Sequence, residues 1–168
     1  MKADAYKGVF RPDSGALLDI RVFETTPKDW QMFLDYVSSH HEVSYAEDGQ
    51  GKPLPKFEVI SDRRNLAAAS LQIRLSGITL NCHFFEVGQM EMDVLPEDVN
   101  TSEKAQWVFD FMVAIARLLS KEVFLTPEFG SATQTELKDS ALCLADPQNG
   151  SIRHRLADGS GKWARDFS

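Results

Sequence analysis

The spacing of apolar residues predicts two helices. In the first, Trp30, Phe33 and Val37 recur at helical intervals, which places them on one face. Thr26 precedes this run and suits the N-cap, because its hydroxyl can accept a hydrogen bond from a backbone N–H of the first turn. The pattern therefore predicts a short amphipathic helix over residues 27–39.

The second predicted helix covers residues 101–120 and is more apolar than the first. Asn100 suits its N-cap, and Glu103 completes a capping box three residues later. The apolar stripe that follows is wider than that of an ordinary amphipathic helix, so we expect the helix to be mostly buried against a sheet. Its members are Trp107, Val108, Phe109, Phe111, Met112, Val113, Ile115, Leu118 and Leu119.

Alternation of apolar and polar residues predicts strands in much of the remaining chain. Leu18, Ile20 and Val22 alternate with Asp19 and Arg21, as in a half-buried strand. Further strand-like runs occupy residues 5–10, 42–46, 57–61, 68–76, 78–87, 90–95 and 122–128, and a closing hairpin covers 141–156.

These elements predict a single α+β domain over residues 1–168. We expect an antiparallel sheet of about five to seven strands, with the long helix at 101–120 packed on one face and the shorter helix at 27–39. The last residues, 157–168, carry few apolar side chains and are expected to form a loose tail.

The composition is typical of a globular domain, with 43% apolar and 26% charged residues. No stretch reaches the roughly 18–20 uninterrupted apolar residues that span a bilayer. The N-terminus lacks the apolar core of a secretory signal, so we expect a cytoplasmic protein that does not bind membranes. Cys82 and Cys143 lie in apolar runs; a bridge between them is possible, but two buried free thiols are the better expectation.

Negative charge is concentrated in one segment. The chain has a formal charge of −7, which disfavours binding to the phosphate backbone of nucleic acids. No Lys or Arg lies between Leu75 and Glu103, whereas this interval contains six carboxylates. They are Glu86, Glu91, Asp93, Glu97, Asp98 and Glu103.

The acidic segment includes a predicted hairpin. A two-residue turn at Gly88-Gln89 would place Glu86 opposite Glu91 and Phe84 opposite Asp93. Cys82 would then share a face with these four residues, and His83, Phe85, Val87, Met90, Met92 and Val94 would form the other face. A β-bulge could switch the faces along the strand.

Four uses of this charge are consistent with the pattern. The carboxylates could extend into water at the hairpin tip, bind a hard divalent cation, act as a hydrolase pair, or form a docking face. The segment has neither calcium-loop spacing nor an apolar pocket for a raised-pKa acid. We therefore hypothesise a docking face for a basic protein partner, formed by Glu86, Glu91, Asp93, Glu97 and Asp98.

No catalytic or cofactor motif supports an enzyme. The four histidines form no H-x-x-x-H pair, and the chain has no C-x-x-C. The segment 158–163 resembles a phosphate-binding loop, but Leu156 and Trp163 occupy positions that require Gly and Ser or Thr. We expect no metal, no cofactor and no catalytic residues, and hence a non-enzymatic binding protein.

Two other functions remain as alternatives. A chaperone for a secreted effector would be favoured if Phe85, Met90 and Met92 were exposed to solvent. An enzyme acting on a small molecule would be favoured by a deep pocket that contains His83 and two carboxylates.

The C-terminal third resembles small acidic bacterial α+β proteins of the toxin-immunity type. The resemblance lies in a helix that ends near Lys121, a strand that ends in Thr126-Pro127-Glu128, and a later turn with Asp146, Pro147 and Gly150. It implies a non-enzymatic protein that neutralises a toxin by occluding it. The group is diverse, so the resemblance assigns no binding residue to this chain.

Overall fold

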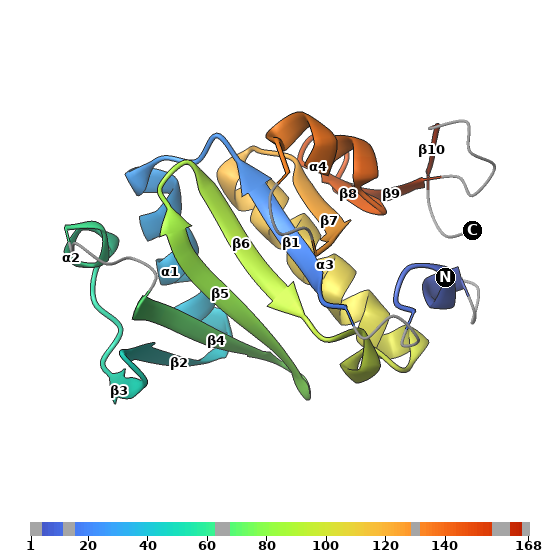
Figure 1. Ribbon diagram of the computed structural model, residues 1–168. Coiled ribbons are helices and arrows are strands. Elements are labelled where there is room, and N and C mark those ends of the chain that lie inside the picture. The colour runs from blue at the N-terminus through green and yellow to red at the C-terminus, as the bar shows by residue number, and fades with distance from the viewer. Residues whose placement is uncertain (1–4, 12–15, 63–67, 129–131, 156–161, 166–168) are drawn as a thin grey trace.

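One antiparallel sheet forms the centre of the fold (Figure 1). The computed structural model describes residues 5–11, 16–62, 68–128, 132–155 and 162–165. In this part of the chain, ten strands pair in the order β10-β9-β8-β7-β1-β6-β5-β4-β2-β3. The α+β class and the antiparallel sheet are therefore as the sequence predicts.

The central strands are β1 (Leu18–Phe23), β4 (Ala69–Leu75), β5 (Ile78–Glu86), β6 (Gln89–Val94) and β7 (Val123–Pro127). The outer strands are β2 (Glu42–Glu47), β3 (Gln50–Lys52), β8 (Cys143–Asp146), β9 (Ser151–Arg155) and β10 (Trp163–Arg165). The helices are α1 (Pro27–His40), α2 (Phe57–Ser61), α3 (Ser102–Leu119) and α4 (Gln134–Ser140), with short 3-10 turns η1 (Ala5–Gly8) and η4 (Pro96–Asp98).

The two long helices begin at side-chain caps. The hydroxyl of Thr26 accepts a hydrogen bond from the backbone N–H of Asp29, whose carboxylate accepts one from the N–H of Thr26. At α3 the N-cap is Thr101, which accepts from the N–H of Lys104. The prediction of Asn100 as the cap is wrong by one residue, because two adjacent residues have suitable side chains and only the backbone geometry chooses between them.

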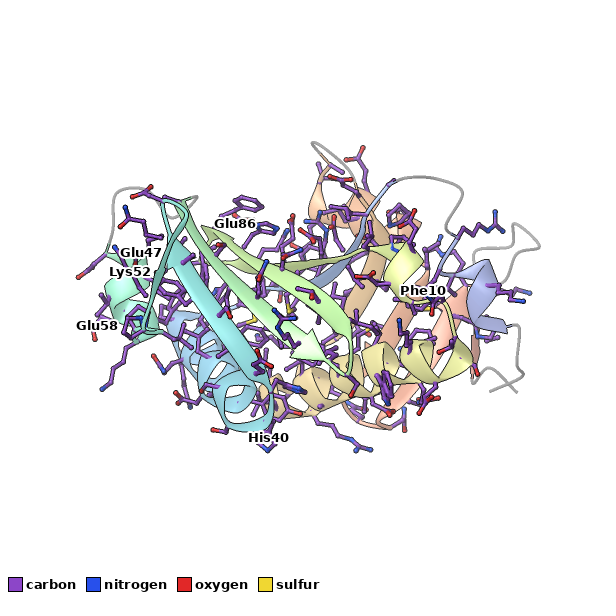
Figure 2. All side chains as sticks on the ribbon, turned by 90° about the horizontal axis from the view of Figure 1, so that it is seen from below. Phe10, His40, Glu47, Lys52, Glu58 and Glu86 are labelled. Carbon is purple, nitrogen blue, oxygen red and sulfur yellow. The ribbon has the colours of Figure 1, made fainter. Side chains whose placement is uncertain are left out.

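The two faces of the sheet are covered differently. Helices α1 and α3 pack on one face, where they bury the apolar residues of the strands in the main core. Figure 2, viewed from below, shows these helices on one side of the sheet, with His40 at the end of α1 and Glu86 on the other side. On that other side, α4 covers only the end of the sheet near β7 and β8, through Leu137 and Ala141.

The sheet has ten strands where five to seven were expected. The two edge strands, β3 and β10, have three residues each, which is too short for a period-2 pattern to be recognised. β3 lies within a segment that reads as a polar loop, and β10 lies within the segment 157–168 that was expected to be a loose tail. The tail residues other than 162–165 lie outside the described part of the chain.

Two predicted strands are helical instead. Residues 57–61 form α2, in which Phe57 and Ile60 are buried and Glu58 and Val59 are exposed. An apolar pair three residues apart fits one turn of helix, and a five-residue run is too short for periodicity to decide. In the segment 5–10, residues 5–8 form the 3-10 turn η1.

An aromatic cluster joins α1 to the hairpin of β5 and β6. The side chain of Trp30 is fully buried, and its ring stacks on that of Phe57 with centroids 5.0 Å apart. Its centroid also lies 5.1 Å from that of Phe84, and its indole N–H donates to the carbonyl of Val87 at 2.9 Å. Trp30 therefore fixes α1 against the end of the β5–β6 hairpin.

Replacement of this indole should be costly. We expect Trp30→Ala to lower the free energy of unfolding by about 3–5 kcal/mol, because it leaves a large cavity and removes a hydrogen bond to Val87. Urea unfolding followed by circular dichroism measures the loss. The control is Val59→Ala, which truncates an exposed apolar side chain and should change stability by less than about 0.5 kcal/mol. Equal effects of the two substitutions would contradict this role for Trp30.

Candidate functional site

Polar side chains occupy the face of the sheet opposite α1 and α3, which we call the helix-free face because α4 covers only its end near β7 and β8. Register places two rows of residues side by side across the central strands. One row is Ser44, Gln72, Asn81, Asp93, Asp19 and Thr126, and the next is Ser70, His83, Glu91 and Arg21. Seven of these residues form two bonded groups, which we together call the sheet network: Asp19, Arg21, Glu91 and Thr126, and next to them Asn81, His83 and Asp93.

Arg21 is the cation at the centre of the sheet network. Its side chain is only 5% exposed, and it forms ion pairs with Asp19, at 2.5 Å, and with Glu91. Its Nε donates to the hydroxyl of Thr126 at 3.3 Å. Burial raises the pKa of Asp19 to about 6, although the guanidinium of Arg21 acts in the opposite direction. This carboxyl therefore gains a proton at a higher pH than an exposed aspartate does.

His83 and Asp93 form the second part of the sheet network. The imidazole Nε2 lies 2.6 Å from a carboxylate oxygen of Asp93, and the amide of Asn81 donates to the other oxygen at 2.7 Å. The hydrogen bond to Asp93 raises the pKa of His83, and partial burial opposes this shift. Burial acts to raise the pKa of Asp93, but the hydrogen bonds from His83 and Asn81 outweigh it, so this pKa lies below the usual value.

An exposed aromatic ring lies on this pair. The ring of Phe85 stacks on the imidazole of His83, with centroids 4.9 Å apart and planes 3° from parallel. The side chain is 54% exposed, the most exposed of the large apolar side chains in the described part of the chain. Because Asp93 holds the imidazole, the stacked ring of Phe85 is held with it.

The predicted register of the β5–β6 hairpin is wrong. Glu86 pairs with Gln89 and His83 pairs with Glu91, with a register shift between His83 and Glu86. The pairing of β5 with β6 shifts by one residue at this irregularity. A shift of one residue moves the side chains of the paired strand to the opposite face of the sheet. Met90 and Met92 consequently join Cys82 in the core, and Glu91 shares the helix-free face with His83.

The five predicted partner-binding carboxylates do not form one surface. Glu91 and Asp93 lie on the same face but are bonded to Arg21 and to His83 and Asn81. Glu86 is exposed near the turn of the hairpin, and Glu97 and Asp98 belong to η4, beyond the opposite end of β6. The length of β6 separates Glu86 from η4 by about 20 Å, at about 3.3 Å per residue.

Sequence reasoning did not identify Asp19, Arg21 and Thr126 as members of the site. The alternation in β1 showed that Asp19 and Arg21 share a face. It could not show that β1 lies between β6 and β7, which brings these side chains to Glu91 and Thr126. β1 lies inside the sheet, and charged side chains at the centre of a sheet need partners on the neighbouring strands. The strand order would therefore have been needed to predict these partners from the sequence.

The sheet network has few features of a catalytic site. Ser70 pairs in register with His83, which brings a Ser, a His and an Asp to three neighbouring strands. No hydrogen bond joins the described side chains of Ser70 and His83, and neither the hollow beside Lys138 nor the one beside Trp107 is lined by them. Among the described residues, no three His, Cys, Asp or Glu side chains are grouped to hold a metal ion. Cys82 and Cys143 are free and buried, and burial raises the pKa of both thiols.

Comparison with protein-family models, curated proteins and solved structures gave no match to this chain. None of the helices in the described ranges is both long enough and apolar enough to cross a membrane.

Removal of the buried guanidinium should destabilise the fold. We expect Arg21→Met to cost about 3–5 kcal/mol at pH 7, because it leaves the carboxylates of Asp19 and Glu91 close together without a cation. Adding Asp19→Asn should restore part of the loss. The matched control is Arg74→Met, which breaks the exposed pair with Glu42 and should cost less than about 1 kcal/mol. Urea unfolding at pH 7 measures all three, and equal losses for Arg21→Met and Arg74→Met would count against the network.

The pair of His83 and Asp93 should make stability depend on pH. Because the folded pKa of His83 is raised, its contribution is fully present below its unfolded pKa of about 6.5 and is lost as pH rises through the folded value. The contribution of Asp93, whose folded pKa is lowered, is lost as pH falls through that value. We expect the stability difference between the wild type and His83→Gln to be larger at pH 5.5 than at pH 9.

The same pair can be tested by NMR titration of the four histidines. The signal that disappears in His83→Gln identifies His83. We expect Asp93→Asn to lower the pKa of His83, because the substitution removes the charge that stabilises the imidazolium. An unchanged pKa would mean that the contact with Asp93 does not form in solution.

Proposed function

We propose that this chain is a non-enzymatic binding protein that engages a basic protein through the helix-free face of its sheet, around Phe85. The observation that carries the proposal is the half-exposed ring of Phe85, stacked on His83 beside the sheet network. A rigid aromatic side chain contributes a large contact area at a low cost in conformational entropy, and aromatic residues commonly dominate interface energies.

The charges around Phe85 support a basic partner. Four carboxylates lie in the sheet network and the adjoining hairpin turn, Asp19, Glu86, Glu91 and Asp93, beside the guanidinium of Arg21 and the imidazole of His83. This part of the face is therefore negative overall, even though most of its charges are paired. Glu86 is the carboxylate that is best placed to meet a cation of a partner, because it is exposed beside Phe85.

The wider class of this function is an occluding protein of the immunity type. The resemblance of the C-terminal third favours it, and an acidic surface suits a toxin with a basic active site. The chaperone alternative is weakened because only Phe85 of its three residues is exposed, whereas Met90 and Met92 are fully buried. An enzyme is not favoured, because no hydrogen bond joins His83 to the described side chain of Ser70 and both cysteines are buried.

The proposal can be tested by affinity capture from a lysate of the native host, followed by mass spectrometry and calorimetry with the purified partner. We expect a basic protein that binds the wild type and Val59→Ala alike. Phe85→Ala should weaken its affinity about 30-fold, as for a typical hot-spot residue. Glu86→Lys should slow association and reduce its dependence on salt, because it removes electrostatic steering.

Glu86 is chosen for charge reversal instead of Glu91 or Asp93. The latter two bond to Arg21 and His83, so their replacement would test folding as well as binding. A partner that binds Phe85→Ala as tightly as the wild type would refute the proposed face. An acidic partner would refute the electrostatic part of the proposal.

A further inference from the structure

A second surface feature lies on the helix side of the sheet, away from the sheet network. The end of α1, the first half of α3 and the turn between β4 and β5 enclose a hollow of about 220 Å³. Tyr36, His41, Trp107, Asp110 and Phe111 line it. His40, labelled in Figure 2, marks the end of α1 next to this hollow.

Aromatic rings form most of the wall. The ring centroids of Tyr36 and His41 lie 6.0 Å apart, and those of His41 and Phe111 lie 5.7 Å apart, both pairs edge to face. Tyr36 also stacks on His40 at 4.4 Å. The faces of Tyr, Phe and Trp rings carry partial negative charge and attract cations. The wall therefore favours a flat, positively charged group.

A carboxylate accompanies the rings. Asp110 is exposed; one of its oxygens accepts from Gln106 at 2.8 Å, and a carboxylate can accept several donors. The Nε2 atom of His41 is buried and has no hydrogen-bond partner among the described residues. Burial, with a smaller effect from His40, lowers the pKa of His41, which disfavours a positive charge on the ring beside the hollow.

We propose that this hollow binds a guanidinium group, which stacks on the aromatic wall and donates N–H groups to the exposed carboxylate of Asp110. A guanidinium matches the site in three respects, since it is cationic, planar and carries several N–H donors. None of the described residues that line the hollow is Lys or Arg, so no basic side chain of the wall repels a cation there. This site is independent of the proposed partner face, which lies on the other side of the sheet.

The proposal can be tested by NMR titration of the intact protein with ethylguanidinium at constant ionic strength. We expect saturable shifts of the Trp107 indole signal, with a dissociation constant of about 1–10 mM. Tetramethylammonium has the same charge but no N–H donors, so it should bind at least about threefold more weakly. Asp110→Asn should weaken ethylguanidinium binding about threefold, because it removes the exposed charge.

Controls separate this site from non-specific attraction to an acidic protein. Asp139→Asn removes an exposed carboxylate on α4 and should leave the titration unchanged. N-acetylarginine amide distinguishes the source of the guanidinium. Binding comparable to that of ethylguanidinium indicates an arginine of a protein chain, and binding of ethylguanidinium alone indicates a small molecule; either result supports the site. Absence of saturable shifts, or equal binding of tetramethylammonium, would overturn the proposal, and neither result would bear on Phe85.

Discussion

The buried guanidinium of Arg21 is the constraint on which the arrangement of the sheet depends most. It joins β1 to Glu91 on β6 and to Thr126 on β7, two strands that follow it by 70 and 105 residues in sequence. A buried cation is stable only when its counterions and acceptors are close and well oriented. The position of Arg21 therefore requires that β1 lie between these two strands, and it connects the β4–β5–β6 meander to the C-terminal strands.

This constraint changes the meaning of the acidic segment. Sequence alone presents Glu91 and Asp93 as repelling charges in a stretch without Lys or Arg. In the fold, their partners come from outside β6: Arg21 is supplied by β1, and His83 by β5. Local charge counting could not find these partners, because they depend on strand order and register. The local count did identify a segment whose carboxylates form specific interactions. Those of Glu91 and Asp93 are made within the fold.

The predictions that succeeded depend on local patterns. The helical spacing of Trp30, Phe33 and Val37 gave α1 almost to the residue, and the alternation in β1 gave the correct faces for Asp19 and Arg21. The failures arose where a short run fits two structures, as in α2, or where a single irregularity changes a register, as between His83 and Glu86. In the first case, Phe57 of α2 stacks on Trp30, which is a long-range contact that periodicity does not contain.

The end of β5 links the core to the surface. By the ordinary alternation of a strand, Phe84 points into the aromatic cluster around Trp30 while Phe85, the next residue, stacks on His83 on the opposite face. The carbonyl of Val87, just beyond it, accepts hydrogen bonds from both Trp30 and Thr25, so the end of the hairpin is held from the helix side. The position of the exposed ring is therefore set by the core as well as by the sheet network.

A face of this kind, whose charges are mostly paired, exerts only a modest long-range attraction, so its affinity for a partner should come from short-range contacts at Phe85. Such contacts act mainly on the rate of dissociation, whereas Glu86, the exposed carboxylate beside the ring, acts on the rate of association.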